Sequence, residues 1–282
     1  MQTILVTGAT GTIGANVVNE LVKLGDVKVR VAARDAKKVP AGTEAVDFDW
    51  DKPDSIAAAV KGADAVFLLT PFVENPVPYA KALVDAARAA GVKKIVKLSA
   101  AGADNPTFPS IKHHADAEKL VEASGAKWVH LRPNFFVTNF VGYYPPDAEG
   151  TIYMPTGNGK ASWIDPRDIA EVAARVLTRP DWDNRALALD GGEALSVGDV
   201  AKAIADATGR TIRHVDVPEA AARSAMEGMK MPAWMIDSMM SLYNVIKQGW
   251  AVGTSTAVQD VTGHAPRTVA AFAKENASAW KK

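Results

Sequence analysis

The sequence contains no cysteine among its 282 residues, and this absence excludes several kinds of site. Without thiols, the chain can form no disulfide, no thiolate metal centre and no cysteine nucleophile. An excess of one charge is also lacking, because 32 Lys and Arg residues balance 32 Asp and Glu residues. A chain without a basic excess gives no reason to expect nucleic acid as a partner. The absence of cysteine suits a protein of the reducing cytoplasm.

Long apolar runs are lacking too. No stretch is apolar for long enough to span a bilayer, and no basic amphipathic stretch is typical of a membrane surface. The N-terminus enters an apolar run directly at Ile4, which leaves no room for a signal peptide. The hydrophobic fraction of 48% is enough for a sizeable core. We therefore expect a soluble, cytoplasmic protein with no membrane partner, and the sequence leaves open whether it is a monomer or a homodimer.

The most informative segment is TGATGTIG at residues 7–14, which lies between an apolar run and a predicted helix over residues 15–24. A glycine turn between a strand and a helix is typical of a dinucleotide site. Gly8 turns the chain off the strand, Gly11 lets the backbone approach a pyrophosphate, and Gly14 lets the helix pack closely on the sheet. The cofactor residues predicted in this turn are Gly8, Thr10, Gly11, Thr12, Ile13 and Gly14. The apolar positions predicted on the buried face of the helix are Val17, Val18, Leu21, Val22 and Leu24.

Strand and helix patterns alternate along the following residues. Further strands are predicted at 27–33, 45–48, 65–69, 94–98 and 128–131, with helices at 53–60, 77–90 and 113–124. This order predicts a Rossmann-type, doubly wound α/β fold with a mainly parallel sheet. A stretch rich in Gly, Pro and Tyr at 140–160 suggests a boundary. We place the dinucleotide-binding domain at 1–150. The region 151–282 would complete the sheet and form a small, mostly helical substrate-binding lobe.

Arg34 follows the strand at 27–33, about twenty residues past the glycine turn, where this fold places the residue that faces the adenosine ribose. An acidic residue there would accept from the ribose 2′-hydroxyl of NAD, whereas the planar guanidinium suits a 2′-phosphate. Lys37 and Lys38 would add positive potential. The alternative is an ordinary solvated arginine. We expect NADP(H) to be preferred, with NAD(H) possible.

The other predicted cofactor residues also follow strands, at the carboxyl edge of the sheet where ligands bind in open α/β folds. Asp49 follows the strand at 45–48 and either contacts the adenine edge or serves as an acidic turn residue. The remaining cofactor residues predicted at this edge are Leu69, Thr70, Pro71, Ser99 and Asn134.

Several segments together resemble the NmrA-like branch of the atypical short-chain dehydrogenases/reductases. They are TGATGTIG at 7–14, KIVKLSAAGA at 94–103, AEKLVEASG at 117–125, HLRPNFFVTNF at 130–140 and WIDPRDIAEVA at 163–173. The resemblance implies NADPH as the cofactor. It also implies reduction of a quinone, an azo compound or a triphenylmethane dye, and it places residues 134–140 beside the nicotinamide and the substrate. The branch also includes regulators that bind the dinucleotide without turnover.

The chain departs from ordinary short-chain reductases, which use a serine and a Tyr-x-x-x-Lys pair. Ser99 matches the serine, but Ser110 holds the tyrosine position and His114 the lysine position. No tyrosine occurs between Tyr79 and Tyr143. The one Tyr-x-x-x-Lys spacing, at residues 243–247, is predicted to be structural. A missing proton donor favours an electron-poor conjugated acceptor, whose charge delocalises on reduction, and it equally permits no chemistry.

Histidine titrates near neutral pH, so His113 and His114 are candidates for a proton donor. His114 could instead hold the nicotinamide ribose, and either ring could simply face solvent. The predicted catalytic residues are His114 and Ser99, and no cluster suits a metal. The predicted residues that contact an aromatic substrate are Phe72, His113, Phe135, Phe136, Trp163 and Trp234. Six of the eight methionines lie between residues 226 and 240, either as core filling or as an adaptable wall of the substrate site.

The sequence therefore predicts an NADPH-dependent reductase that transfers hydride to a conjugated aromatic acceptor. Two alternatives stay open: an NADP(H)-binding redox sensor without turnover, and a biosynthetic imine or enone reductase.

Overall fold

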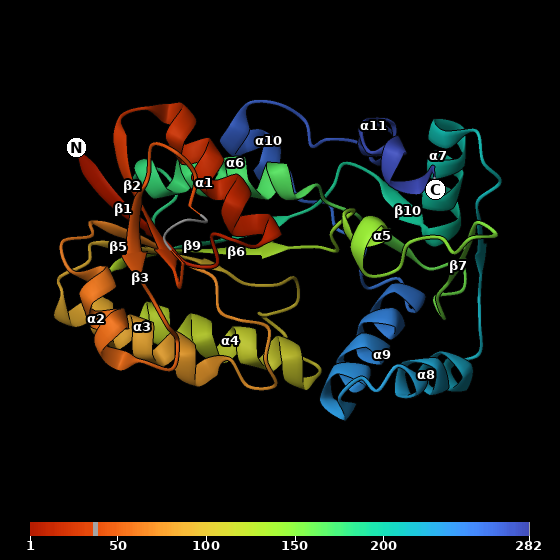
Figure 1. Ribbon diagram of the computed structural model, residues 1–282, viewed down its shortest axis with the longest axis horizontal. Helices are drawn as coiled ribbons and strands as arrows, with labels where there is room; N and C mark the ends of the chain where they lie inside the picture. The colour runs from red at the N-terminus through yellow and green to blue at the C-terminus, as the bar shows by residue number, and fades with distance from the viewer. Residues whose placement is uncertain (36–38, 282) are drawn as a thin grey trace. The chain divides into compact units, whose positions relative to one another are not determined.

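The computed structural model describes residues 1–35 and 39–281 (Figure 1). Lys37 and Lys38 lie outside the described residues. By its internal contacts the chain divides into two units. The first comprises Met1–Pro133, Pro166–Leu189 and Ala257–Gly263, and the second comprises Asn134–Asp165, Asp190–Thr256 and His264–Lys282. The chain returns to the first unit twice after leaving it, and the predicted boundary at residue 150 stays a prediction.

The first unit is built on a seven-stranded sheet, counted over the described residues, in the order β3-β2-β1-β4-β5-β6-β9. Its strands are β1 (Gln2–Val6), β2 (Val27–Ala33), β3 (Glu44–Asp47), β4 (Ala65–Leu68), β5 (Lys94–Leu98), β6 (Lys127–Pro133) and β9 (Arg185–Leu189). Each neighbouring pair is parallel. The order reverses at β1, as in a doubly wound Rossmann fold, so the predicted fold class is confirmed.

Helices cover both faces of this sheet (Figure 1). On one face lie α1 (Thr12–Leu24), α6 (Pro166–Thr178) and α10 (Ala257–Thr262), and on the other lie α2 (Pro53–Val60), α3 (Val77–Ala89) and α4 (Pro109–Glu122). Helix α4 begins four residues before its predicted start, because Pro109 fits the first helical position after an extended Phe108. Val22 and Leu24 are exposed rather than buried, since the buried stripe of α1 ends at Leu21.

The side chain of Thr7 links the carboxyl ends of β1 and β4 by hydrogen bonds. Its buried hydroxyl accepts a hydrogen bond from the backbone N–H of Leu69 at 2.8 Å and lies 3.0 Å from the carbonyl oxygens of Phe67 and Leu69. A polar side chain without water nearby must find such partners. The threonine that opens the glycine segment therefore fixes the turn against the next strand of the sheet.

The second unit has its own apolar core and two small sheets. Strand β7 (Thr151–Tyr153) pairs with β11 (Arg213–Val215), and β8 (Lys160–Ser162) pairs with β10 (Ala194–Ser196). Its helices are α5 (Asn139–Gly142), α7 (Val197–Thr208), α8 (Glu219–Gly228), α9 (Ala233–Lys247), α11 (Val269–Glu275) and the 3-10 helix η2 (Ala277–Trp280). Across the part of the chain that the structure describes, no helix combines the length and apolar character that a membrane crossing requires.

The methionines at 226–240 mostly fill this core. Met226 is buried, and Met231, Met239 and Met240 pack partly buried against the core cluster. Met229 has 73% of its surface exposed, and Met235 is partly exposed. Flexible thioether side chains fill irregular gaps between helices, so core filling accounts for most of this segment.

Candidate functional site

Two glycines of the turn stand where a side chain would be strained or would overlap neighbouring atoms. Gly8 has a φ of +67°, and a Cβ there would lie 2.7 Å from the side chain of Leu69. A Cβ at Gly14 would overlap the carbonyl oxygen of Gly8. Gly14 thus allows α1 to pack against the turn itself, whereas the sequence predicted packing against the sheet. Both glycines are explained by the protein's own packing.

Gly11 differs from the other two. Its φ of −92° and ψ of 172° suit any residue, and a Cβ there would meet only the carbonyl oxygen of Gly8, at 3.4 Å. The described residues therefore give no reason for glycine at this exposed position. The helix that starts here has no side-chain cap and no acidic residue in its first turn. Its first N–H groups have no partner within the helix. This arrangement fits a pyrophosphate resting on the turn, in the space that a Cβ would fill.

The other predicted residues of this turn differ in what they can offer. Thr10 and Thr12 are exposed, whereas the side chain of Ile13 belongs to the core. Ile13 can therefore reach a ligand through its backbone only. Leu69, Thr70 and Pro71 follow β4 and are partly exposed. Since β1 and β4 are neighbours, these two strand ends meet at one edge of the sheet.

Arg34 and Asp49 follow the strands on the other side of β1. Arg34 comes directly after β2 and is exposed, so its guanidinium is available to a ligand. Asp49 is engaged locally: its carboxylate accepts from the backbone N–H of Asp51 at 3.1 Å and lies 3.6 Å from the ammonium of Lys52. These contacts favour the acidic-turn interpretation of Asp49. Both cofactor roles stay predictions.

Ser99, Ser110 and His114 are the residues predicted from the sequence to hold the catalytic positions of ordinary short-chain reductases. Ser99 follows β5, and Ser110 and His114 lie one turn apart on α4. The hydroxyls of both serines are buried, and within the described ranges neither makes a hydrogen bond of normal geometry. Buried hydroxyls without partners are uncommon and indicate a place for a ligand. These two fit the ribose end of a nicotinamide nucleotide.

Sequence reasoning missed Lys97, the residue behind His114. Lys97 lies on β5 with only 2% of its surface exposed, and its ammonium donates to the carbonyl oxygen of Leu98 at 3.0 Å. The same Nζ lies 3.3 Å from Nδ1 of His114. A signal was present, because a central parallel strand is normally apolar throughout and KIVKL carries two lysines.

This burial changes the protonation of both groups. Burial lowers the pKa of Lys97 to about 7, with Glu118 opposing the shift and Arg132 adding to it. Burial, followed by the charge of Lys97, lowers the pKa of His114 to about 3. His114 is therefore neutral near pH 7, contrary to the expectation that it titrates there. A neutral imidazole still carries one N–H donor.

An ion pair between Glu118 and Arg132 lies close enough to Lys97 to influence its pKa. Nε and Nη2 of Arg132 donate to the two carboxylate oxygens of Glu118 at 3.0 and 2.7 Å. Burial works to raise the pKa of Glu118, but the hydrogen bonds from Arg132, together with the polarity of the nearby Ser99 hydroxyl, outweigh it, and the pKa is lowered. The paired arginine matters for another reason. Ligand atoms of Glu118, Glu122 and His130 lie within 4.8 Å of one another, but a cation would have to displace Arg132. We assign no metal to this group.

The predicted residues of the second unit are largely committed to its core. The amide nitrogen of Asn134 donates to the carboxylate of Asp190 and the carbonyl oxygen of Ala251, both at 2.9 Å, and its oxygen accepts from the N–H of Phe135. Trp163 is 1% exposed, and its indole N–H donates to the carbonyl oxygen of Leu195 at 2.8 Å. These bonds weigh against direct ligand contact by Asn134 and Trp163.

The predicted substrate residues are divided between the units. Phe72, which is 65% exposed, and the partly exposed His113 belong to the first. Phe135, Phe136 and Trp234 belong to the second and keep part of their surface exposed. Tyr243 and Lys247 are also in the second unit, where the tyrosine is buried and the lysine pairs with Glu219 at 2.9 Å. That pairing agrees with the predicted structural role of the Tyr-x-x-x-Lys spacing.

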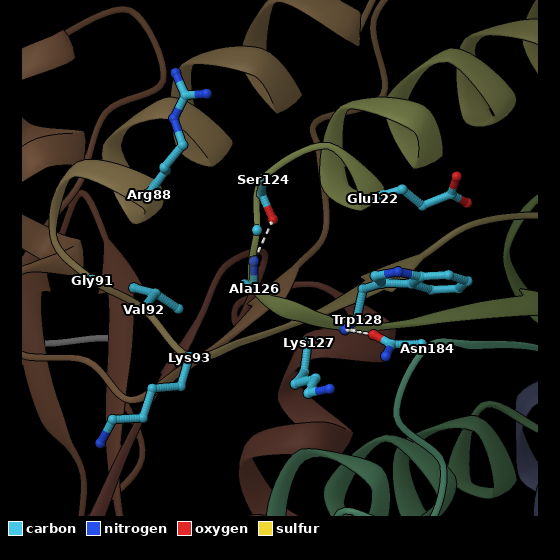
Figure 2. Close-up of a pocket in the computed structure, with 11 residues that line it drawn as sticks. Arg88, Gly91, Val92, Lys93, Glu122, Ser124, Ala126, Lys127, Trp128 and Asn184 are labelled. Atoms are coloured by element: carbon cyan, nitrogen blue, oxygen red, sulfur yellow. Dashed lines mark hydrogen bonds between the residues drawn. The ribbon is translucent and has the colours of Figure 1, made fainter.

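An open depression lies elsewhere on the first unit (Figure 2). It is formed where α3 and α4 end and where β5 and β6 begin, so it lies at the amino edge of the sheet. Its lining residues are Arg88, Gly91, Val92, Lys93, Glu122, Ser124, Gly125, Ala126, Lys127, Trp128 and Asn184. The glycine turn and Ser99 lie at the carboxyl edge, where ligands bind in this fold. The depression is therefore not the predicted cofactor site.

Known proteins resemble this chain over its whole length. Residues 1–273 match the NmrA-like family. An NAD(P)H azoreductase of Xenophilus azovorans is 39% identical over 284 residues, which cover 98% of this chain and 99% of the relative.

Two solved structures share the fold. An NADPH-dependent quinone oxidoreductase of Escherichia coli, complexed with NADPH, has a TM-score of 0.87 at 24% identity and covers 96% of this chain and 99% of that one. A triphenylmethane reductase of Citrobacter sp., complexed with NADP(H), has a TM-score of 0.85 at 23% identity, with 97% and 99% covered. The extent of the family match decides the classification: this chain belongs to the NmrA-like family.

Proposed function

We propose that this protein is an NADPH-dependent reductase of electron-poor conjugated compounds such as quinones and azo dyes. The observation that carries the proposal is the end-to-end similarity to an NAD(P)H azoreductase, at 39% identity. Both chains are covered almost completely, so the similarity includes the cofactor turn and the region of Ser99 and His114. The chain is an NAD(P)H-dependent oxidoreductase, and its acceptor class is the finer part of the proposal.

The cofactor is held by the carboxyl edge of the first unit. The first N–H groups of α1 bind the pyrophosphate, which approaches closely because Gly11 has no side chain. Those N–H groups have no partner within the helix, and the first turn of α1 carries no acidic residue. Arg34 binds the ribose 2′-phosphate and gives the preference for NADP(H). Ser99 and Ser110 offer their buried hydroxyls to the ribose beside the nicotinamide. When bound, the dinucleotide supplies the hydride.

The acceptor class follows from the weakness of the available acid. No tyrosine lies between Tyr79 and Tyr143, and His114 is a neutral imidazole. A neutral imidazole is a poor match for an alkoxide, which needs a strong positioned acid. A reduced quinone or azo compound needs less help from an acid, because its charge is delocalised and solvent can complete its protonation. The exposed Phe72 is the aromatic group of the first unit that is proposed to stack on such acceptors.

The test is loss of NADPH absorbance in the presence of a panel of acceptors. The panel includes quinones, azo dyes, a triphenylmethane dye, simple ketones, a cyclic imine and an enone. We expect turnover with the first three classes and at most slow turnover with the ketones. Turnover of only the imine or the enone would replace the proposed acceptor class with a biosynthetic one. Tight NADPH binding without turnover of any acceptor would identify a redox sensor.

A further inference from the structure

The two lysines of β5 point to opposite faces of the sheet and have different surroundings. Lys94 is ion-paired with Asp183 at 2.5 Å and donates to the carbonyl oxygens of Val176 and Arg179. Lys97, three residues later, meets α4 instead, where it lies beside His114. Among the described residues no carboxylate lies within 4.0 Å of the Lys97 ammonium. Both carboxylate oxygens of Glu118 accept hydrogen bonds from the Arg132 guanidinium instead.

A buried ammonium without an ion pair is costly, so its retention indicates a role. The ammonium can only donate hydrogen bonds. Leu98 accepts one of them, and the remaining neighbour at hydrogen-bond distance is Nδ1 of His114. When Lys97 is charged, Nδ1 must therefore be the acceptor, and the imidazole proton must lie on Nε2.

We propose that Lys97 is a positioning residue that acts through His114, holding its imidazole in the tautomer whose proton lies on Nε2. This inference rests on the proposed function, in which His114 faces the reduced acceptor. After hydride transfer, the Nε2–H bond breaks as its proton moves to the reduced acceptor, where a new N–H or O–H bond forms. At the same time Nδ1 takes a proton from the Lys97 ammonium, which keeps the imidazole neutral. The starting state returns when Nδ1 gives this proton back to the neutral amine and Nε2 takes a proton from solvent water.

Other charges around this pair come from two elements. Helix α4 contributes Glu118, which favours the charged form of Lys97, and His113, which disfavours a charged His114. Strand β6 contributes Arg132, which disfavours the charged form of Lys97, and the buried His130, whose own pKa is lowered chiefly by burial. With these opposing neighbours, burial dominates and the pKa of Lys97 falls to about 7. Lys97 therefore loses its proton as the pH rises through neutrality, and the neutral amine no longer fixes the His114 imidazole in the Nε2–H tautomer.

The test uses histidine labelled with nitrogen-15 in the whole protein, with the signals of His114 identified by their loss in His114→Asn. In the wild type we expect the Nε2–H tautomer at pH 6 and a loss of that fixed tautomer as the pH rises through about 7. Lys97→Met should remove this pH dependence. Lys97→Arg should keep the Nε2–H tautomer throughout, because arginine stays charged. Lys94→Met, a matched change of the other buried lysine, should leave the His114 signals as in the wild type.

Turnover provides the second readout. We expect Lys97→Met to lower kcat about tenfold and to abolish its decline above neutral pH, with the NADPH dissociation constant changed less than about threefold, since a positioned acid is worth about 10²–10⁴ in rate. A wild-type tautomer that does not respond between pH 6 and 8 would overturn the inference even if no Lys97 variant folds. His114 signals unaffected by Lys97→Met would also overturn it, and acceptor turnover would then leave the proposed function standing. Absence of turnover, with the tautomer responding as expected, would reject the proposed function and leave the role of Lys97 supported.

Discussion

The substitution Gly11→Ala tests whether the glycine at this position is needed for binding a ligand or for the stability of the fold. The backbone at Gly11 is extended, and the added Cβ would meet only the carbonyl oxygen of Gly8, at 3.4 Å. The protein therefore has room for the methyl group. Alanine is a poorer N-cap than glycine, but it reduces the entropy of the unfolded chain, so the free energy of unfolding should change by less than about 1 kcal/mol.

Binding should respond differently, because the methyl group would occupy the space assigned to the pyrophosphate. Forcing an extra methyl into a packed contact costs about 1–3 kcal/mol. At 1.4 kcal/mol per tenfold, Gly11→Ala should weaken NADPH binding by about 5- to 150-fold. The dissociation constant would be measured by calorimetric titration, and the free energy of unfolding by urea denaturation.

Two other glycines provide the controls. Gly198, near the start of α7, would place its Cβ 3.6 Å from the hydroxyl of Ser196, so Gly198→Ala should change neither quantity appreciably. Gly14→Ala should instead destabilise the fold, since its Cβ would overlap the carbonyl oxygen of Gly8. A folded Gly11→Ala protein that binds NADPH as tightly as the wild type would refute the placement of the pyrophosphate.

Three further predictions concern selectivity, core packing and acid stability. Arg34→Asp should lower the preference for NADPH over NADH at least tenfold, because a carboxylate repels the 2′-phosphate; an unchanged ratio of dissociation constants would reject the role of Arg34. Trp163→Ala should lower the free energy of unfolding by about 3–5 kcal/mol in urea denaturation, since the indole is 1% exposed and packs against Phe135 and Phe140; a loss below about 1 kcal/mol would contradict its place in the core. The pKa of Glu118 is lowered on folding, so its contribution to stability is present above its ordinary value of 4.5 and is lost as the pH falls below that value. Glu118→Gln should therefore lower the free energy of unfolding near pH 7. On acidification below pH 4.5 this free energy should fall less in the variant than in the wild type, and an equal fall in both would argue against this linkage.

The strands and helices that flank the glycine turn could be predicted because their signals are local. Alternation of short apolar runs with helical patterns predicted the parallel sheet, and the glycine spacing predicted where its first turn lies. The ends of the helices and strands were harder to predict. Val22 and Leu24 continue an apolar pattern past the point where α1 stops facing the sheet, so their exposure depends on tertiary packing.

The candidate site was only partly predictable, because its decisive contact joins distant positions. Lys97 and His114 are 17 residues apart, and the packing of α4 against β5 brings them together. The same packing explains why His114 is neutral, since an isolated histidine would titrate near neutral pH. The sequence also could not indicate that the Asn134 amide and the Trp163 indole are used by hydrogen bonds within the second unit. A residue type suggests a chemistry, but its partners decide whether the group is available.

The central claim is that NADPH rests on the glycine turn at the start of α1. Backbone amide hydrogen exchange, followed with and without NADPH, tests it most directly because each amide reports its own protection. NADPH should slow exchange at residues 10–14 and leave the amides around the depression at Lys93 and Lys127 unchanged. Unchanged exchange at residues 10–14 under saturating NADPH would contradict the account.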